Sequence, residues 1–394
     1  MRDDDVVLAA CARTPFGRFG GALRGLDAPA LGALAIDEVL RRAAADAAAV
    51  DVVYGGVGMI SAAMLTPVRQ AVLRSRLPET TPSAAIDRAC CSGMTAIGLG
   101  FKDIRLGEAY MALAGGFESL SRTPMLWPRQ REARIGPVTV DDPLLLRGAV
   151  VEQPIAVYSG QEALRHGVTR EQQDRWAQQS HQRYADAQAA RFFDGERFAV
   201  APPGGPPLLE DESPRTEVSL EKLAALPTVY GGPTITAGNA PGLNDGAAFV
   251  LLARRDAARA AGLAPLARIV DYVQVCGGPT SGTTTPALAI QRLAERQRAD
   301  PLGWDLLEIN EAYAATPLVS TLLLARHDPA RLGQLRERTN VHGGAVALGH
   351  PLGASGARLV MTLALALRRR GGGRGAAAIC GGFGQGDAVL VEAE

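Results

Sequence analysis

Cys90 is the strongest candidate for a nucleophile in this chain. It lies in the run AIDRACCSGMTAIGLG, where a strand-like segment turns sharply through Ser92 and Gly93 into a helix that begins with small residues. The start of a helix presents unpaired N–H groups and partial positive charge, which lower the pKa of a thiol from about 8.5 and favour the nucleophilic thiolate. The alternative is a buried, inert cysteine, and the adjacent Cys91 shows that one cysteine does not identify a site by itself.

Histidines in a glycine-rich run are the candidates for proton transfer. His350 lies in NVHGGAVALGHPLGASGARLVMTL, where it precedes Pro351 on a rigid turn that opens a helix. Such a density of glycine indicates backbone that passes close to a ligand, and this turn is not a typical place for a core histidine. His342 is the weaker candidate, and we expect it at the surface or behind the site.

Two strand ends complete the set of chemical groups. Cys380 ends the strand-like run of AICGGFGQGDAVLVE and is followed by three glycines in four residues, so that backbone N–H groups can be directed at a bound oxygen. Asn310 and Glu311 stand at a strand-to-helix transition in EINEAYAA, where a simple N-cap is the alternative for Asn310. Together with Cys90 and His350, these residues would supply a nucleophile, a base, a second acid or base and oxyanion donors.

The elements that must position these residues alternate between strands and helices. Strand-like runs begin at Val6, Val52 and Tyr110, and a helix over Leu31 to Ala44 has its apolar residues on one face. This pattern predicts an α/β fold. Between about residues 121 and 237 the sequence changes to prolines, charges and one long helix with a capping box at Thr169.

We therefore predict an N-terminal α/β half over residues 1–120, completed by about 238–262, an inserted loop domain over 121–237, and a C-terminal α/β half over 263–394. Two segments of the first half recur in the second half in the same order. Ser92 matches Ser355 and Ala114 matches Cys380, which favours a duplication of the two halves.

The composition excludes several classes of function. Formal net charge is zero, which gives no reason to expect a nucleic acid or a membrane surface as partner. No apolar stretch stays uncharged over the roughly 18 residues of a membrane span, and the start MRDDDVV resembles no targeting peptide, so we expect a cytoplasmic protein. The five cysteines lack disulfide-framework or zinc-like spacing, which predicts free thiols and no metal site.

These runs resemble the four catalytic blocks of the thiolase family, in the family's order and over nearly the full length. The blocks are CxSG at Cys90, NEAxA at Asn310, GHPxGxSG at His350 and CxGxG at Cys380. The resemblance implies a five-layered αβαβα core of two pseudo-symmetric halves, with an inserted loop domain that covers coenzyme A. It also implies assembly as a homodimer or homotetramer.

By the same resemblance, Cys90 attacks an acyl thioester after activation by His350, and the backbone N–H groups of Cys90 and Gly382 hold the oxyanion. Cys380 then takes the α-proton of a second acyl-CoA, while His350 and a water held by Asn310 stabilise the enolate. The implied reaction is a ping-pong, CoA-dependent Claisen condensation, or the reverse thiolysis of a 3-ketoacyl-CoA. Coenzyme A is then a substrate or product, and no tightly bound cofactor is implied.

Five residues are candidates for contact with coenzyme A or the acyl group. The guanidinium of Arg215, in DESPRTEVSLEKLAAL, could bind a phosphate of the coenzyme A nucleotide, although a solvated surface arginine is equally expected there. A proline stands in NAPG where relatives often have a serine that holds the pantetheine arm. The five residues are Arg215, Ala240, Pro241, Gly242 and Tyr313.

Other departures from the family pattern lie near the site. Asp87 and His342 both stand where relatives commonly have asparagine, and an unpaired carboxylate at Asp87 would raise the pKa of the thiol unless Arg88 or another cation neutralised it. The run PIAVYSGQEALRHG has no counterpart of the Met-Gly…Ala-Glu-Asn segment that lines the acyl pocket of many relatives. We therefore expect a branched, longer-chain or pathway-specific acyl group.

Two rival functions remain open. A condensing enzyme of the same fold with a carrier-protein substrate typically has histidine or asparagine in place of Cys380. A catalytically silent scaffold of an acyl-CoA complex has no physical need for Cys90, Asn310, His350 and Cys380 together.

Overall fold

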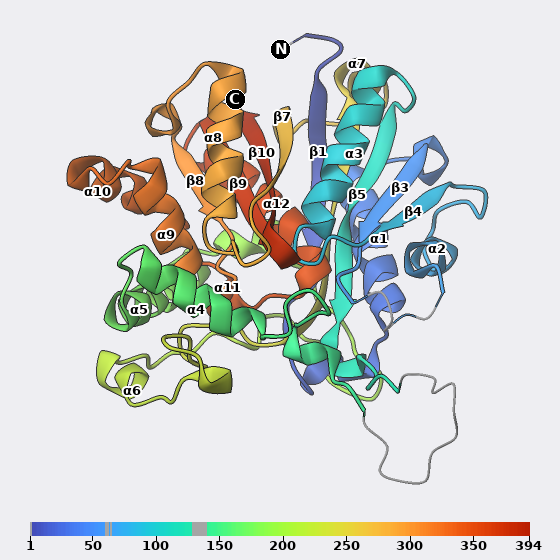
Figure 1. Ribbon diagram of the computed structural model, residues 1–394. Helices are drawn as coiled ribbons and strands as arrows, with labels where there is room; N and C mark the ends of the chain where they lie inside the picture. The colour runs from blue at the N-terminus through green and yellow to red at the C-terminus, as the bar shows by residue number, and fades with distance from the viewer. Residues whose placement is uncertain (1, 60–62, 64, 128–139) are drawn as a thin grey trace.

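The computed structural model describes residues 2–59, 63, 65–127 and 140–394, and its strands join in one twisted sheet flanked by helices (Figure 1). The strands are β1 (Val6–Arg13), β2 (Gly17–Arg18), β3 (Val52–Gly56), β4 (Ser83–Ile86), β5 (Met111–Ser119), β6 (Asn244–Arg254), β7 (Ala267–Cys276), β8 (Leu306–Ile309), β9 (Gly373–Gly381) and β10 (Gln385–Ala393). The α-helices are α1 (Ala28–Ala43), α2 (Pro67–Leu73), α3 (Ser92–Leu106), α4 (Ile155–Arg165), α5 (Arg170–Ala189), α6 (Leu220–Ala224), α7 (Arg255–Ala260), α8 (Thr285–Gln297), α9 (Ala315–Leu324), α10 (Pro329–Glu337), α11 (Ala345–Leu348) and α12 (Leu352–Arg369).

The sheet consists of two similar parts. Its strand order is β4-β3-β5-β6-β1-β7-β10-β9-β8, with β2 paired to β6. In the first part β3 is parallel to β5, whereas β5 and β6, and β6 and β1, are antiparallel. The second part repeats these directions, since β8 is parallel to β9, whereas β9 and β10, and β10 and β7, are antiparallel. A short antiparallel pairing of β1 residues 6–8 with β7 residues 267–269 joins the parts. The predicted pseudo-symmetric halves are therefore confirmed in the order and direction of the strands.

Helices α3 and α12 lie between the two parts of the sheet, and other helices cover their outer faces (Figure 1). One core joins α3 and α12 to strands of both parts. A second core lies under α1 and α2, and a third under α8 and α10. The predicted succession of five α and β layers is confirmed. Burial on both faces explains why β5 and most of β9 consist of small or apolar residues without alternation.

Local sequence signals place the ends of several helices. Asp27 accepts a hydrogen bond from the backbone N–H of Ala30, so the helix predicted from Leu31 begins three residues earlier, at Ala28. The predicted capping box of α5 is present, since Thr169 and Gln172 each accept a bond from the other's backbone N–H.

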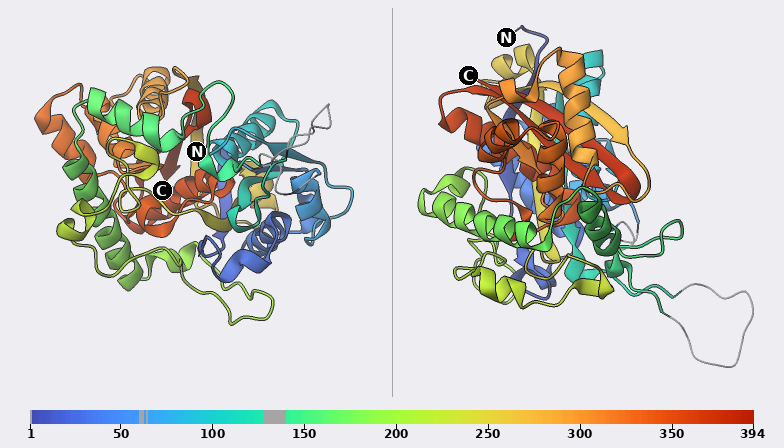
Figure 2. Two further views of the ribbon diagram at one scale, coloured as in Figure 1. Left: turned by 60° about the horizontal axis from the view of Figure 1, so that its bottom comes forward. Right: turned by 60° about the vertical axis from the view of Figure 1, so that its left-hand side comes forward.

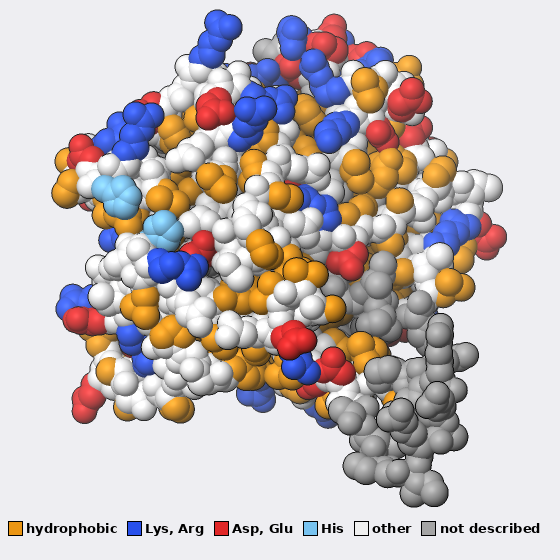
Figure 3. All heavy atoms as spheres, viewed as in Figure 1, with side chains coloured by type: hydrophobic (Ala, Val, Ile, Leu, Met, Phe, Trp, Pro, Cys, Tyr) orange, Lys and Arg blue, Asp and Glu red, His pale blue; other side chains and the backbone are white. Residues whose placement is uncertain are grey.

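The segment between β5 and β6 contains α4, α5 and α6, which Figure 1 and the right-hand view of Figure 2 both show below the sheet. Over the face drawn in Figure 3, arginine and lysine are interspersed with aspartate and glutamate. Within the described ranges, no helix is both long and apolar enough to cross a membrane. All five cysteines are free thiols, as predicted.

Candidate active site

Helices α3 and α12 pack closely against each other at their N-terminal ends, because glycines there leave room for the contact. A Cβ added at Gly93 would lie 2.2 Å from the carbonyl oxygen of Gly353, and one at Gly356 would lie 2.3 Å from the backbone nitrogen of Met94. Larger residues would separate the helices. The glycines of the CxSG and GHPxGxSG blocks thus bring together the two turns that contain Cys90 and His350.

Cys90 and His350 form a close pair across this contact. The Sγ atom of Cys90 lies 3.1 Å from His350 Nε2, and His350 Nδ1 lies 2.6 Å from the hydroxyl oxygen of Ser355. Ser355 Oγ is also 3.4 Å from the Pro351 carbonyl oxygen, to which it can donate. Its oxygen then accepts from Nδ1–H, so the lone pair of Nε2 is directed at the thiol. The arrangement can move a proton from sulfur to nitrogen.

Burial controls the charge of both partners. It raises the pKa of the Cys90 thiol well above its ordinary value, with smaller contributions from Cys380 and Glu118, and lowers the pKa of His350 to about 3. The expectation that the helix start would lower the pKa of this thiol is therefore wrong, because desolvation disfavours the thiolate more strongly. The resting pair is a neutral thiol beside a neutral imidazole, so the nucleophile has to be generated by transfer to His350.

Cys380 lies at the end of β9, directly beside the turn that contains Cys90. A Cβ added at the next residue, Gly381, would lie 2.7 Å from the Arg88 carbonyl oxygen and 2.9 Å from Cys91 Sγ. Cys380 is buried, and desolvation raises the pKa of its thiol to about 12. A neutral thiol of this kind is a proton donor to a carbanion and, once deprotonated, a strong base.

Asn310 and Glu311 follow β8 and differ in their surroundings. Both side-chain amide atoms of Asn310 are buried and make no hydrogen bond with the described part of the protein. Glu311 accepts from Trp176 Nε1 at 2.8 Å, Ser180 Oγ at 2.7 Å and the Val346 backbone N–H at 3.0 Å. Glu311 therefore joins α5 and α11 to the site, whereas Asn310 keeps its amide available for a ligand.

An apolar cavity of about 240 Å³ opens onto Cys90 and His350. Tyr313 lines it together with three residues of the NAPG run, Ala240, Pro241 and Gly242. Contact of these four residues with a substrate stays a prediction. Most of the other lining side chains are aliphatic, and they are Leu144, Leu145, Leu146, Ile155, Ala156, Val229, Tyr230, Ala237, Leu243, Ala312 and Leu352.

Arg215 lines a cavity next to the one at Cys90. This cavity, of about 330 Å³, is also lined by Arg18 and His181, and it shares Ala237, Ala240 and Gly242 with the one at Cys90. Arg215 is exposed, and its backbone N–H donates to His181 Nδ1 at 3.2 Å. The two cavities adjoin, with Cys90 lining one and Arg18, Arg215 and Glu212 lining the other.

Comparison with known proteins decides the family. Residues 6–256 match the family model "Thiolase, N-terminal domain" and residues 263–393 match "Thiolase, C-terminal domain". The chain belongs to the thiolase family. It is 38% identical to a probable acetyl-CoA acetyltransferase of Mycolicibacterium smegmatis, over 98% of this chain and 100% of that protein. It is 37% identical to a beta-ketoadipyl-CoA thiolase of Pseudomonas aeruginosa, over 98% and 99%.

Solved thiolase structures agree with this assignment. The crystal structure of human mitochondrial 3-ketoacyl-CoA thiolase in complex with CoA superposes with a TM-score of 0.92 at 35% identity, covering 99% of this chain and 98% of that one. The acetyl-CoA acetyltransferase of Bacillus anthracis gives the same TM-score at 33% identity, covering 99% of each chain. The prediction of a thiolase-type acyltransferase, able to perform Claisen condensation or thiolysis, is confirmed at the level of the family.

The departures from the thiolase pattern have local explanations. Asp87 is exposed, and its carboxylate accepts the backbone N–H of Ala89 at 3.0 Å. Arg88 pairs with Asp387. His342 stacks on Phe192 with ring centroids 3.7 Å apart, and burial lowers the pKa of His342 to about 4. His342 thus serves packing in this thiolase, whereas Asp87 makes a local hydrogen bond at the surface.

Two residues that position His350 were missed in the sequence. Ser355 was noted only as a repeat of Ser92, although its place five residues after the histidine in the GHPxGxSG block was a usable signal. Asn244, at the start of β6, accepts the His350 backbone N–H at 2.9 Å. Its separation of 106 residues left no signal in a single sequence.

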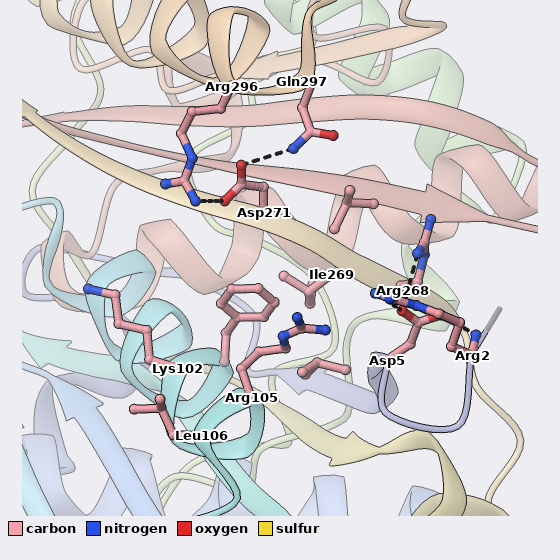
Figure 4. Close-up of a pocket in the computed structure, with 13 residues that line it drawn as sticks. Arg2, Asp5, Lys102, Arg105, Leu106, Arg268, Ile269, Asp271, Arg296 and Gln297 are labelled. Carbon is pink, nitrogen blue, oxygen red and sulfur yellow. Dashed lines mark hydrogen bonds and ion pairs between the residues drawn. The ribbon is translucent and has the colours of Figure 1, made fainter.

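A larger cavity, of about 470 Å³, lies apart from this thiolase site (Figure 4). It shares no lining residue with the cavity at Cys90. Figure 4 shows two of its arginines beside acids: Arg296 is 2.9 Å from Asp271, and Arg268 is 3.2 Å from Asp5. These ion pairs lie around β7 near its pairing with β1, and we assign them to stability.

Proposed function

We propose that this thiolase cleaves or forms 3-ketoacyl-CoA through an acyl intermediate on Cys90. The observation that supports it best is the 3.1 Å contact between Cys90 Sγ and His350 Nε2 at the end of an apolar cavity. In thiolysis, His350 takes the thiol proton and the thiolate attacks the 3-keto carbon. The backbone N–H groups of Cys90 and Gly382 stabilise the resulting oxyanion.

Collapse of this adduct breaks the bond between the 2- and 3-carbons and leaves the acyl group on Cys90. The departing enolate takes a proton from the neutral Cys380 thiol, while protonated His350 and a water held by Asn310 stabilise its oxygen. An incoming CoA thiol then gives its proton to the Cys380 thiolate and attacks acyl-Cys90. The proton on His350 returns to Cys90, and the condensation runs through the same steps in reverse.

The cavity supports an apolar acyl chain as the substrate. Among the described residues that line it, none is lysine or arginine, and most are leucine, isoleucine, valine or alanine. A terminal carboxylate, as in a beta-ketoadipyl group, would be buried there without a partner at a cost of several kcal/mol. The missing Met-Gly…Ala-Glu-Asn segment is replaced by α4, whose Ile155 and Ala156 line the cavity.

Turnover of a panel of 3-ketoacyl-CoAs tests the proposal. We expect unbranched or branched apolar chains of six or more carbons to exceed 3-ketoadipyl-CoA in kcat/KM by about 100-fold or more. Cys90→Ala should abolish all turnover. Equal turnover of 3-ketoadipyl-CoA would overturn the chain assignment, and turnover of no CoA thioester would favour a carrier-bound substrate or a scaffold.

We also propose that residues 121–237 cover coenzyme A and that the chain assembles as a homodimer or homotetramer. The adjoining cavities at Cys90 and Arg215 support residues 121–237 as the cover of coenzyme A. Strand β4 lies at an edge of the sheet, exposes Ala84 and Ala85, and stands just before the nucleophile turn. A free strand edge is a surface for pairing with a second copy, which supports a homodimer or homotetramer. Light scattering gives the mass in solution, and a monomer at working concentrations would count against it.

A further inference from the structure

The two turns predicted to bind the thioester oxygen come from different halves of the chain. Cys90 lies on the turn before α3, and Gly382 lies on the turn between β9 and β10. Their N–H groups can stabilise one oxygen only if the distance between the turns is fixed within a fraction of an ångström. Direct packing contributes to this, since a Cβ added at Gly382 would lie 3.4 Å from Ala89 Cβ.

The nucleophile turn has an unfavourable backbone conformation. Ala89 has a φ of +50°, in the left-handed region that costs a non-glycine residue about 1 kcal/mol. Ser92 holds the turn closed, because its hydroxyl accepts from the Arg88 N–H at 2.8 Å and donates to the Ala89 carbonyl oxygen at 2.6 Å. These bonds fix the turn itself and leave its position relative to Gly382 undetermined.

A chain of side-chain hydrogen bonds connects the two turns. Arg88 Nε donates to Gln385 Oε1 at 2.8 Å, and Gln385 Nε2 donates to the Gly382 carbonyl oxygen at 3.2 Å. One glutamine thus holds the nucleophile turn through its oxygen and the glycine turn through its nitrogen. Arg88 and Gln385 are 297 residues apart in the sequence.

Asp387 anchors this chain to the sheet. Its buried carboxylate pairs with Arg88 and accepts from Thr95 Oγ1 at 2.6 Å and from the Tyr272 hydroxyl at 2.8 Å. Arg88 also donates to Thr95 Oγ1 at 2.8 Å. A guanidinium held on several sides has one orientation, which fixes where its Nε meets Gln385.

We infer that Arg88, Gln385 and Asp387 are positioning residues that keep the N–H groups of Cys90 and Gly382 converged on the thioester oxygen. The inference rests on the proposed acyl-Cys90 reaction and concerns how its oxyanion site is held. None of the three residues lines the cavity at Cys90. They act on acylation through the two turns.

Two substitutions at Gln385 test the link without leaving a buried charge unpaired. Gln385→Met removes both hydrogen bonds, whereas Gln385→Glu keeps the acceptor for Arg88 and removes the donor to Gly382. The double variant Arg88→Met/Asp387→Leu replaces the buried ion pair by apolar groups, a change that proteins often tolerate. Gln297→Met is the matched control, because Gln297 is half-buried, bonds Asp271 and lies apart from the site.

The readout is the ratio of two rates at Cys90: acylation by an acyl-CoA in a single turnover, and alkylation by iodoacetamide, which develops no oxyanion. We expect both Gln385 variants and the double variant to lower this ratio about 10- to 100-fold, with KM and alkylation nearly unchanged. The control should match the wild type. An unchanged ratio in Gln385→Met, or wild-type behaviour of Gln385→Glu, would overturn the inference. Absence of acylation in the wild type would instead refute the proposed function.

Discussion

Residues 114–119 and 380–385 share Gly-Gly-Phe at their second to fourth positions and begin on equivalent strands, yet they differ in structure. The first, AGGFES, continues as part of the straight, fully buried strand β5. The second, CGGFGQ, ends β9 at Gly381 and turns directly into β10, with positive φ at Phe383 and Gly384. A Cβ added at Gly384 would lie 2.1 Å from the Gly278 carbonyl oxygen, so only glycine fits this turn.

The difference shows how a duplicated half becomes a catalytic one. In the first half the partner strand β6 begins only at residue 244, so β5 runs on and its N–H groups are used in the sheet. In the second half the tight turn ends the strand at Gly381, one residue after Cys380, and leaves the backbone of the turn beside the segment that contains Cys90. Glu118 of the first half accepts N–H groups of Gly58, Met59 and Gly353, and thereby supports the helix start next to His350.

The comparison of the two segments is tested most strongly at their first residues, Cys380 and Ala114. Cys380→Ala should lower turnover about 10⁴-fold, because Cys380 exchanges the α-proton in the proposed reaction, while acylation of Cys90 by an acyl-CoA persists. Ala114→Ser is the matched change in the first half, and it should reduce stability only, since it buries an extra hydroxyl. Steady-state kinetics and thermal unfolding separate the two effects. Comparable losses of turnover in both variants would remove the distinction between the halves.

A second test concerns His350, which lies just before α12. His350→Asn should slow acylation of Cys90 about 10³-fold, because the neutral imidazole is the proton acceptor. Since the pKa of His350 is lowered to about 3, the imidazole stays neutral above about pH 4, and wild-type acylation should lose its base only below that pH. The rate of adduct formation against pH measures this. A wild-type rate that falls between pH 7 and 6 would show a protonated His350 and contradict the account.

Gly116 and Gly382, the third residues of the two segments, should differ in how substitution by alanine affects stability. A Cβ at Gly116 would lie 2.1 Å from the Gly353 carbonyl oxygen, so Gly116→Ala should destabilise the protein by about 3 kcal/mol. Gly382→Ala meets only Ala89 Cβ at 3.4 Å and should keep the fold. Denaturant unfolding of both variants gives the comparison. Equal stability of the two variants would show that the first-half glycine is not a packing requirement.

The smallest expected effect concerns Glu118. Burial raises its pKa to about 7, so between about pH 4.5 and 7 the folded protein holds a proton that the unfolded chain releases. Its contribution to stability is therefore present at low pH and is lost as the pH rises to 7. Glu118→Gln should weaken this fall by about 2 kcal/mol, whereas exposed Glu108→Gln should not change it. Denaturant unfolding at pH 5 and 7 distinguishes the two variants. An equal change in the free energy of unfolding between these pH values for Glu118→Gln and wild type would refute the raised pKa of Glu118.

Features with local causes could be predicted from the sequence. The capping box of Thr169, the strand from Val6 and the turn-to-helix blocks at Cys90 and His350 depend on neighbouring residues, and all are present in the structure. The union of the two sheet parts through β1 and β7 was not predicted, because it depends on how the halves pack.

Burial and long-range partners account for what the sequence could not supply. The sign of the pKa change at Cys90 was wrong because the helix start is a local feature, whereas desolvation depends on the whole fold. Asn244 and Gln385 act on His350 and Arg88 from distant segments. No spacing rule connects such residues in one chain without related sequences.

The most direct measurement of the central claim is the site of acylation. Purified protein would be mixed with an apolar acyl-CoA, quenched and mapped by peptide mass spectrometry, in the wild type and in Cys90→Ala, Cys91→Ala and Cys380→Ala. The account predicts one acyl group on Cys90, present in all but Cys90→Ala. An acyl group on Cys380, or one that persists in Cys90→Ala, would contradict the assignment of the nucleophile.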